Sequence, residues 1–392
     1  MAPPRIMLSA GEASGDRLGA GLARALRRLR PDVELFGMGG EQMAGAGVDI
    51  VQDAAEVAVV GFFEVLSHLP ALRAAKRKLE ASLDRRRPDL LVPIDYPDFN
   101  FILAGQARRR DVPVVYFVSP QIWAWRRGRV KKVRRLMRRM LVLFPFEVAF
   151  YREAGVPVTF VGNPVIERDV SERSSEELRK RAGFEAETTV VGLLPGSRRG
   201  EVERLLPEML GAAIRLNASR PGLEFLIPLA PGLRREVVER HVERSEVPNV
   251  RLHSVDFPEI LRICAAGVVA SGTASLEGAI VGLPMIVVYR IGTLSYWISR
   301  ALVRVDHIAM PNLVAGRRVV PELVQSACTP ERIATGLLRY LDDPGLAEQV
   351  RGELAEVRRR LGEPGVFDRA AEAVLAELKS PKTPHPRGPE GA

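Results

Sequence analysis

The stretch Gly267-Val-Val-Ala-Ser-Gly-Thr-Ala-Ser-Leu-Glu277 predicts a buried strand, a tight turn and the start of a helix. A short apolar run that ends in small and hydroxyl residues is typical of the strand–turn–helix unit of α/β folds. The first amide groups of a helix have no partner within it and attract anions. We therefore expect a nucleotide diphosphate here, with Glu277 on the ribose hydroxyls. The phosphate contacts would come from Gly272, Thr273, Ala274 and Ser275. The alternative is a turn that only caps its helix.

Strand-like and helix-like segments alternate along the chain, which predicts parallel, doubly wound α/β sheets. In the first half we expect strands at 5–9, 33–37, 90–94, 114–118, 140–144 and 158–161, and helices at 16–30, 40–46, 62–85, 99–110, 126–139 and 146–154. In the second half we expect strands at 190–194, 224–228, 250–252, 267–270 and 285–289, and helices at 200–219, 232–243, 257–264 and 275–281.

The length of 392 residues suggests two domains, which we place at 1–165 and 166–345, with a cleft between them. Helices at 330–341 and 346–378 are expected to close the chain, the second packing back towards the first domain. Residues 379–392 are rich in Pro and Gly, and we expect a disordered tail there.

The composition, with 46% hydrophobic and 27% charged residues, is that of a globular protein, and no apolar run is long enough to span a membrane. The formal charge of +9 is concentrated in 126–139, which holds nine Lys or Arg and no acid. Apolar residues recur there at helical spacing, which predicts an amphipathic basic helix. They are Val130, Val133, Leu136, Met137 and Met140. Such a face suits nucleic acid, anionic lipid or a phosphorylated substrate, or is simply solvated.

Two segments of the first half end strands with polar side chains. The turn after the first strand, which is not a dinucleotide fingerprint, contains Gly11, Glu12, Ser14, Gly15 and Asp16. An acceptor sugar or its phosphate suits this turn, and plain helix capping is the alternative. Asp95 and Asp98 follow the strand at 90–94 and are candidates for a general base, or for residues that only shape a turn.

Two further segments come from the second half. Gly196, Ser197 and Arg198 follow its first strand, where an Arg could neutralise a departing diphosphate. Asn312, in an expected loop at 309–316, could bind a base or sugar edge. Two indoles, Trp123 and Trp125, precede the basic segment and suit a sugar face, a membrane interface or a core.

Taken in order, six motifs resemble those of the lipid A disaccharide synthases, which are glycosyltransferases of the GT-B class. The resemblance runs from about residue 5 to 375. The motifs are Gly11-Glu-Ala-Ser-Gly-Asp16, Ile94-Asp-Tyr-Pro-Asp-Phe-Asn100, Val118-Ser-Pro-Gln-Ile-Trp-Ala-Trp-Arg126, Leu194-Pro-Gly-Ser-Arg198, Ala270-Ser-Gly-Thr-Ala-Ser-Leu-Glu277 and Pro311-Asn-Leu-Val-Ala-Gly316. Two positions depart from the family, since Asn163 replaces a common His and Tyr96 replaces a common small residue.

The resemblance implies two Rossmann-like domains, of which 1–165 binds acceptor and lipid and 166–345 binds a UDP-sugar. It implies transfer from UDP-2,3-diacylglucosamine to the 6-hydroxyl of 2,3-diacylglucosamine 1-phosphate, with inversion and release of UDP. Asp95 would be the base, supported by Asp98 and Asn100, and Arg198 would stabilise the leaving group. Asn312 would lie on the donor side, and no cofactor or metal is implied. A related UDP-GlcNAc enzyme, such as a peptidoglycan glycosyltransferase or a 2-epimerase, is the alternative.

Because both implied substrates carry acyl chains, we expect a cytoplasmic protein associated peripherally with the inner membrane through 126–139 and the apolar segment 61–66. Nucleic acid is not an expected partner, because it gives no reason for the motifs at 194–198 and 271–277. A homodimer is left open.

Overall fold

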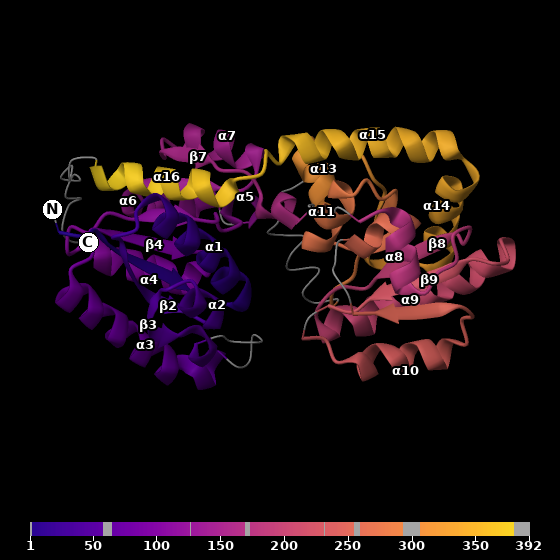
Figure 1. Ribbon diagram of the computed structural model, residues 1–392, viewed down its shortest axis with the longest axis horizontal. Coiled ribbons are helices and arrows are strands. Elements are labelled where there is room, and N and C mark those ends of the chain that lie inside the picture. Colours follow the sequence, from indigo (N-terminus) through magenta and orange to yellow (C-terminus); the bar gives the residue numbers. More distant parts are fainter. Residues whose placement is uncertain are drawn as a thin grey trace. The chain divides into compact units, whose positions relative to one another are not determined.

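The computed structural model describes residues 2–57, 65–125, 127–168, 173–230, 232–254, 259–292 and 306–379. The chain divides into two compact units (Figure 1). Unit 1 comprises Met1–Pro164 and Glu363–Ala392, and unit 2 comprises Val165–Gly362. The expected tail at 380–392 and most of the apolar segment at 61–66 lie outside the described residues.

Unit 1 contains a parallel sheet of seven strands in the order β3-β2-β1-β4-β5-β6-β7. The strands are β1 (Arg5–Ala10), β2 (Glu34–Gly39), β3 (Asp49–Asp53), β4 (Leu90–Ile94), β5 (Val115–Phe117), β6 (Arg139–Val142) and β7 (Val158–Phe160). The helices are α1 (Ala13–Leu29), α2 (Glu41–Gly45), α3 (Val65–Arg86), α4 (Pro97–Arg108), α5 (Ile122–Trp125), α6 (Val130–Leu136), α7 (Pro145–Glu153) and α16 (Val366–Lys379). All five residues of β4 are buried, because helices cover both faces of a parallel sheet.

The C-terminal helix α16 packs on α1 and is drawn in yellow over unit 1 in Figure 1. Its buried Glu377 accepts from Arg138 at 2.7 Å and from Arg139 at 2.6 Å. A Cβ added to Gly21 of α1 would lie 2.5 Å from the ring of Phe367. The end of the chain therefore completes the core of unit 1.

Unit 2 contains a parallel sheet of six strands in the order β10-β9-β8-β11-β12-β13. The strands are β8 (Val190–Leu194), β9 (Glu224–Pro228), β10 (Val250–His253), β11 (Cys264–Ala270), β12 (Met285–Tyr289) and β13 (Glu322–Val324). The helices are α8 (Ser175–Ala182), α9 (Arg199–Ser219), α10 (Arg235–Ser245), α11 (Thr273–Ile280), α13 (Met310–Ala315), α14 (Pro330–Asp342) and α15 (Pro344–Arg360). Helix α15 packs on α11, α13 and α14.

The prediction of parallel, doubly wound sheets is confirmed, but several elements differ from their predicted form. The sequence patterns gave no sign of β3, β13 or α8, and the expected loop at 309–316 contains α13. The expected helix at 346–378 is two helices, since Gly362 and Gly365 adopt positive φ between α15 and α16. The expected helix at 257–264 is a 3-10 turn at Glu259–Ile263 within the part described.

The predicted basic helix at 126–139 was wrong in extent. Its α-helical part, α6, is limited to Val130–Leu136, and a 3-10 turn at Arg127–Arg129 precedes it. Met140, expected on the apolar face of the helix, lies on strand β6. Strand pairing with β5 and β7 accounts for the early end of the helix. No described helix is long and apolar enough to cross a bilayer.

Candidate active site

Two motifs of unit 1 start side by side at the carboxyl edge of its sheet. Strands β1 and β4 are neighbours, and Ala10 pairs with Ile94 at their ends. The turn that begins at Gly11 and the turn that begins at Asp95 therefore leave the sheet at the same level. Ligands of open α/β sheets bind at this edge.

The backbone of Asp95 is fixed by three hydrogen bonds. Its N–H donates to the carbonyl of Phe117 at 3.1 Å, and its carbonyl accepts from the Tyr116 hydroxyl at 2.6 Å and from Asn100 Nδ2 at 2.7 Å. Both Asp95 and Tyr96 have left-handed φ values, 48° and 51°. Such a conformation persists only where surrounding contacts impose it, and it is frequent at functional sites.

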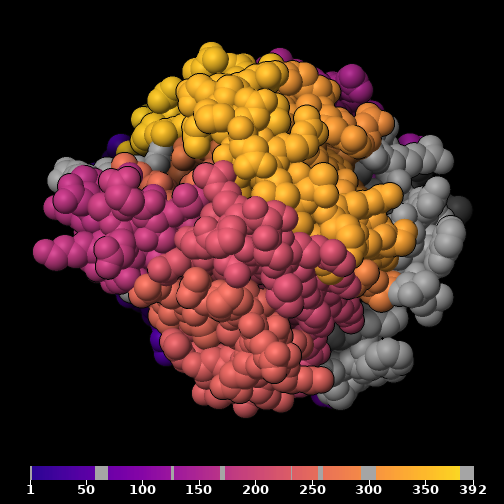
Figure 2. Space-filling view, turned by 90° about the vertical axis from the view of Figure 1, so that its right-hand side faces the viewer, coloured from indigo at the N-terminus to yellow at the C-terminus, as the bar shows by residue number. Residues whose placement is uncertain are grey.

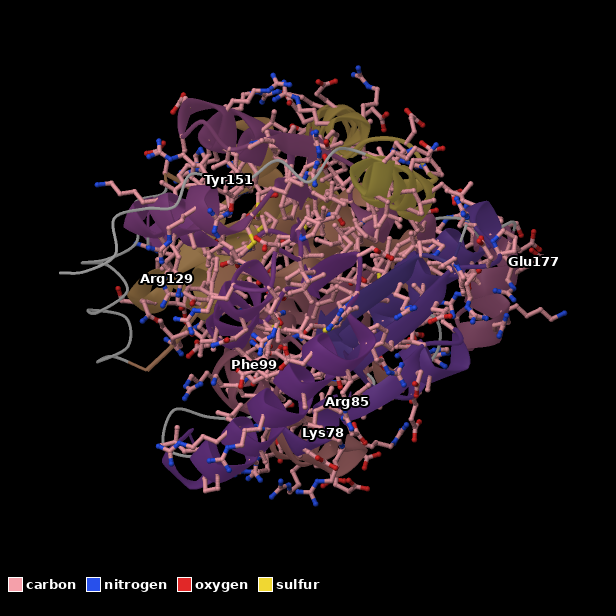
Figure 3. All side chains as sticks on the ribbon, turned by 90° about the vertical axis from the view of Figure 1, so that its left-hand side faces the viewer. Lys78, Arg85, Phe99, Arg129, Tyr151 and Glu177 are labelled. Carbon is pink, nitrogen blue, oxygen red and sulfur yellow. The ribbon has the colours of Figure 1, made fainter. Side chains whose placement is uncertain are left out.

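The two candidate bases have different surroundings. Asp95 is half-buried, and burial followed by the charge of Glu12 raises its pKa to about 6. Asp98 is 77% exposed and forms an ion pair at 2.8 Å with Arg129, which Figure 3 labels. A general base works best with a pKa near the working pH. The two carboxylates therefore differ in burial and in pKa, and which of them is the base stays a prediction.

Two polar residues of these motifs are engaged with backbone groups. The buried Asp16 accepts from the N–H groups of Gly40, Gln42 and Met43, at 2.7, 3.0 and 3.1 Å, and so caps α2. The buried Asn100 accepts from Ser9 Oγ at 2.7 Å and donates to the carbonyl of Asp95. Both side chains hold the turns in place, and their contact with a substrate stays a prediction.

The remaining residues of the first turn differ in exposure. Glu12 and Ser14 are exposed at the start of α1, whereas Gly11 and Gly15 are buried. A Cβ on Gly15 would lie 3.3 Å from Ala10 Cβ, so its small size lets α1 approach the strand ends closely. Within this turn, Glu12 and Ser14 are therefore the side chains open to a ligand.

Sequence reasoning missed a buried polar cluster beneath the 118–126 motif. Ser119 Oγ lies 2.8 Å from the Tyr151 hydroxyl, and Glu147 accepts from the N–H of Phe144 at 3.1 Å. Burial raises the pKa of Glu147 to about 7. Trp123 is buried and packs edge-on against Phe146, with ring centroids 4.8 Å apart. Of the roles left open for Trp123, the structure assigns it to packing.

Unit 2 repeats this arrangement with its own pair of turns. Strand β8 neighbours β11, and Leu194 pairs with Val269. The turn at Gly196–Arg198 and the turn at Gly272–Ser275 therefore lie together at the carboxyl edge of the second sheet. Gly272, with φ of 142°, is the N-cap of α11.

The residues of the α11 turn differ in their exposure to solvent. Thr273 is exposed, whereas Ser275 and Glu277 are buried. Ser275 Oγ donates to the carbonyl of Gly272 at 2.7 Å, and Ser271 Oγ donates to the carbonyl of Ile308 at 3.0 Å. The backbone amides of the first turn and the Thr273 hydroxyl are therefore the groups best placed for an anion.

Glu201, which the sequence did not single out, organises the neighbouring turn. Its Oε2 accepts from the N–H groups of Ser197 at 3.1 Å and Arg198 at 3.3 Å. Gly196 has φ of 106°, and a Cβ there would lie 2.3 Å from Glu201 Oε2. The side chain of Arg198 is 82% exposed, 3.6 Å from Glu201 Oε1. The turn thus presents an exposed cation on a backbone that is hydrogen-bonded to Glu201.

Asn312 lies buried in α13 and holds the chain that leads into β13. Its Oδ1 accepts from the N–H groups of Val319 and Val320, at 2.7 and 2.9 Å, and its Nδ2 donates to Glu322 Oε1 at 2.7 Å. Glu322 also accepts from the N–H groups of Ile308 and Ala309, at 3.0 and 3.1 Å. The amide of Asn312 is occupied by these contacts, and its role towards a donor stays a prediction.

A family model described as "Lipid-A-disaccharide synthetase" matches residues 6–372. The chain belongs to the lipid-A-disaccharide synthase family. The synthase of Myxococcus xanthus is 47% identical over 376 residues, which cover 96% of this chain and 98% of that protein. The synthase of Geobacter metallireducens is 46% identical over 374 residues, covering 95% and 97%. The predicted family is therefore confirmed.

Solved structures with the same fold have little sequence in common with this lipid-A-disaccharide synthase family member. They include a Staphylococcus aureus MnaA–UDP co-structure, with a TM-score of 0.66 and 13% identity over 96% of this chain and 97% of that chain. Another is Acinetobacter baumannii MurG, with a TM-score of 0.59 and 13% identity over 95% and 100%. These likenesses confirm the predicted GT-B-like fold.

Membership of the lipid-A-disaccharide synthase family also gives the reaction class. The chain is a glycosyltransferase with lipid-A-disaccharide synthase activity, and it acts on lipid A precursors. The prediction of an enzyme of this kind is confirmed.

Proposed function

We propose that Asp95 is the general base of an inverting transfer to 2,3-diacylglucosamine 1-phosphate. The Asp95 carboxylate takes the proton of the acceptor's 6-hydroxyl as that oxygen attacks C1 of the sugar in UDP-2,3-diacylglucosamine. A new C1–O6 bond forms, the bond from C1 to the diphosphate breaks, and UDP leaves with the electron pair. The products are the β-1,6-linked disaccharide 1-phosphate and UDP.

The observation that carries this proposal is the setting of Asp95. Its backbone is fixed on three sides at the end of β4, and its pKa of about 6 leaves it mostly ionised at neutral pH yet basic enough to accept a proton. Glu12 and Ser14 lie on the adjoining turn and are exposed to an acceptor. Asp98 has an exposed ion pair instead and would act only by shaping the loop with Arg129.

We place the UDP group of the donor at the carboxyl edge of the second sheet. The backbone amides of Thr273 and Ala274 at the start of α11 and the Thr273 hydroxyl would bind the diphosphate, with Gly272 allowing its close approach. Arg198, on the adjoining turn, would neutralise the charge that grows on departing UDP. The UDP in the Staphylococcus aureus co-structure is in keeping with a UDP-linked donor.

We further propose that α6 holds the protein against an anionic membrane surface, where the acylated substrates reside. Four of its cations are exposed. They are Lys131, Lys132, Arg134 and Arg135. Arg138 and Arg139, by contrast, are only partly exposed, and both pair with Glu377 of α16. The exposed face is therefore smaller than the nine cations of the sequence run suggest.

The direct test is incubation of the purified chain with both acylated substrates, followed by mass spectrometry. We expect a disaccharide 1-phosphate and one UDP for each disaccharide. The Asp95→Asn variant should bind UDP as the unaltered protein does while forming no disaccharide above a trace. Unchanged turnover in that variant would remove Asp95 from the proposed role.

A further inference from the structure

A cavity of about 320 Å³ lies in unit 2, away from the turns of that unit at Gly196–Arg198 and Gly272–Ser275. Its walls come from the segment 317–321, from α14 and from α15, whose surfaces are yellow on the face shown in Figure 2. The segment 317–321 leads into β13, and Tyr340 contacts the carbonyl of Met285 at the start of β12. The cavity therefore lies at the amino ends of these strands, whereas the α11 turn lies at the carboxyl ends.

The charged residues of this cavity are unbalanced. Three arginines line it, together with one acid, Glu353, which pairs with Arg317. The other two arginines, Arg318 and Arg339, are exposed and have no ion-pair partner within the part of the chain that the structure describes. The cavity thus offers two uncompensated guanidinium groups to an anion.

The rest of the lining is mainly apolar. Val319, Val320 and Val350 are buried, and Leu346 and Pro321 are partly so. Tyr340 is buried beside them, and its hydroxyl donates to the carbonyl of Met285. The cationic side chains lie at the exposed border of the cavity, and its interior is apolar. Such a lining suits a ligand with one anionic and one apolar part.

We propose that this cavity is a second ligand site, which binds an amphiphilic phosphate monoester. A phosphate carries a charge of about −1.5 to −2 and three acceptor oxygens, so that it can engage Arg318 and Arg339 together. The apolar group would lie on Val319, Val350 and Leu346. A volume of about 320 Å³ is at the lower end of the range for small-molecule sites and limits the ligand to a short apolar body.

The surroundings of the cavity connect it to the α11 turn. Helix α15 supplies Leu346, Gln349, Val350 and Glu353 to the lining and also packs on α11. A second connection runs through hydrogen bonds, from Val319 and Val320 to Asn312, from Asn312 to Glu322, and from Glu322 to Ile308. Ser271 in turn donates to the carbonyl of Ile308. A ligand that moves α15 or the 317–321 segment would thereby alter the turn at which we place the donor diphosphate.

Binding is tested by calorimetry on the full chain with octyl phosphate below its micelle concentration, inorganic phosphate and octyl glucoside. We expect octyl phosphate to bind at least tenfold more tightly than either of the other two. In the double variant Arg318→Gln, Arg339→Gln the affinity for octyl phosphate should fall at least tenfold. Leu346→Trp, which fills the apolar part of the cavity and keeps both charges, should lower that affinity by a similar factor.

The matched control is Arg332→Gln with Arg244→Gln, two exposed arginines that do not line the cavity. An equal loss in this control would show attraction by net charge alone and overturn the proposal. Equal binding of inorganic phosphate and octyl phosphate would overturn the apolar half of the site. Thermal unfolding identifies any variant that has lost its fold.

The connection between the cavity and the α11 turn is tested by titrating UDP with and without saturating octyl phosphate. This test rests on the proposed function, which places UDP at that turn. We expect the affinity for UDP to change at least twofold, and Leu346→Trp to abolish the change. Direct competition would place octyl phosphate in the donor site and overturn the second site. If octyl phosphate leaves the UDP affinity unchanged, the cavity is not connected to the α11 turn. If UDP does not bind at all, the proposed donor site is wrong.

Discussion

Tyr96 and Gly11 are in such close contact that no side chain fits at Gly11. A Cβ there would lie 2.2 Å from Tyr96 Cδ1, and Tyr96 is itself held by a hydrogen bond of 2.9 Å from its hydroxyl to the carbonyl of Val57. The two turns at the carboxyl edge of the first sheet are thereby packed against each other. The Tyr96 ring therefore fixes the loop that carries Asp95.

Gly11→Ala is expected to destabilise the protein by about 2 kcal/mol, the usual cost of overpacking, and to lower turnover by displacing the Asp95 loop. Thermal unfolding and a disaccharide assay check both effects. Gly105→Ala is the control, because nothing lies within 4 Å of an added Cβ in that part of α4. If the contact is the cause, adding Tyr96→Ala to Gly11→Ala should restore part of the lost stability. A double variant no more stable than the single one would contradict this account.

Asp95→Asn is expected to lower kcat by roughly 10²- to 10⁴-fold, the range for loss of a general base, with little change in UDP affinity. Asp98→Asn is its matched control. Because Asp98 is 77% exposed and contacts Arg129, we expect less than a tenfold effect there. A larger loss from Asp98→Asn than from Asp95→Asn would exchange the two assignments.

The pKa of Asp95 predicts the acid limb of the pH–rate profile. Since only the carboxylate can accept a proton, kcat/KM should fall about tenfold for each pH unit below about 6. Glu12→Gln removes the nearby charge that helps to raise this pKa, so the limb should move to lower pH. If the acid limb of Glu12→Gln lies at the same pH as that of the unaltered protein, a group other than Asp95 causes it.

The same pKa predicts how Asp95→Asn affects stability. The folded-state pKa of about 6 lies above the unfolded value of about 3.9, so the ionised carboxylate disfavours folding above pH 6 and costs nothing below pH 4. Asp95→Asn should therefore raise the free energy of unfolding by about 3 kcal/mol at pH 8, with most of the gain lost near pH 4. Urea unfolding at the two pH values measures the difference. A gain of equal size at both would indicate a packing effect instead.

Reversal of two exposed cations tests the membrane contact of α6. Lys131→Glu with Arg135→Glu should weaken binding to anionic vesicles at least tenfold, because each cation near such a surface contributes about 1 kcal/mol. The control reverses Arg240 and Arg244, which lie one turn apart on α10 and are also exposed. Vesicle sedimentation measures binding, and UDP affinity should not change in either variant. Equal loss in both would mean that net charge alone governs attachment.

Much of the fold and the outline of the site could be predicted from the sequence. Buried strands such as Leu90–Ile94 are continuous apolar runs, and the residues that follow them stand at a sheet edge in any parallel α/β fold. Asp95 and the Ser271–Glu277 turn could therefore be found by local pattern alone. Strands β3 and β13 could not, because Asp49-Ile-Val-Gln-Asp53 and Glu322-Leu-Val324 are not continuous apolar runs.

The sequence by itself determined which residues end the strands, because burial and strand–turn–helix chemistry are local properties. Only the tertiary structure decided which of those residues remain open to a ligand. Asp16 caps a helix 24 residues away, and Arg139 meets Glu377 across 238 residues. Hydrogen bonds and ion pairs of this kind depend on which strands become neighbours, a choice that sums contacts over the whole chain. For that reason the motif at 94–100 identified two aspartates, and only the packed sheet, by burying Asp95 and exposing Asp98, distinguished them.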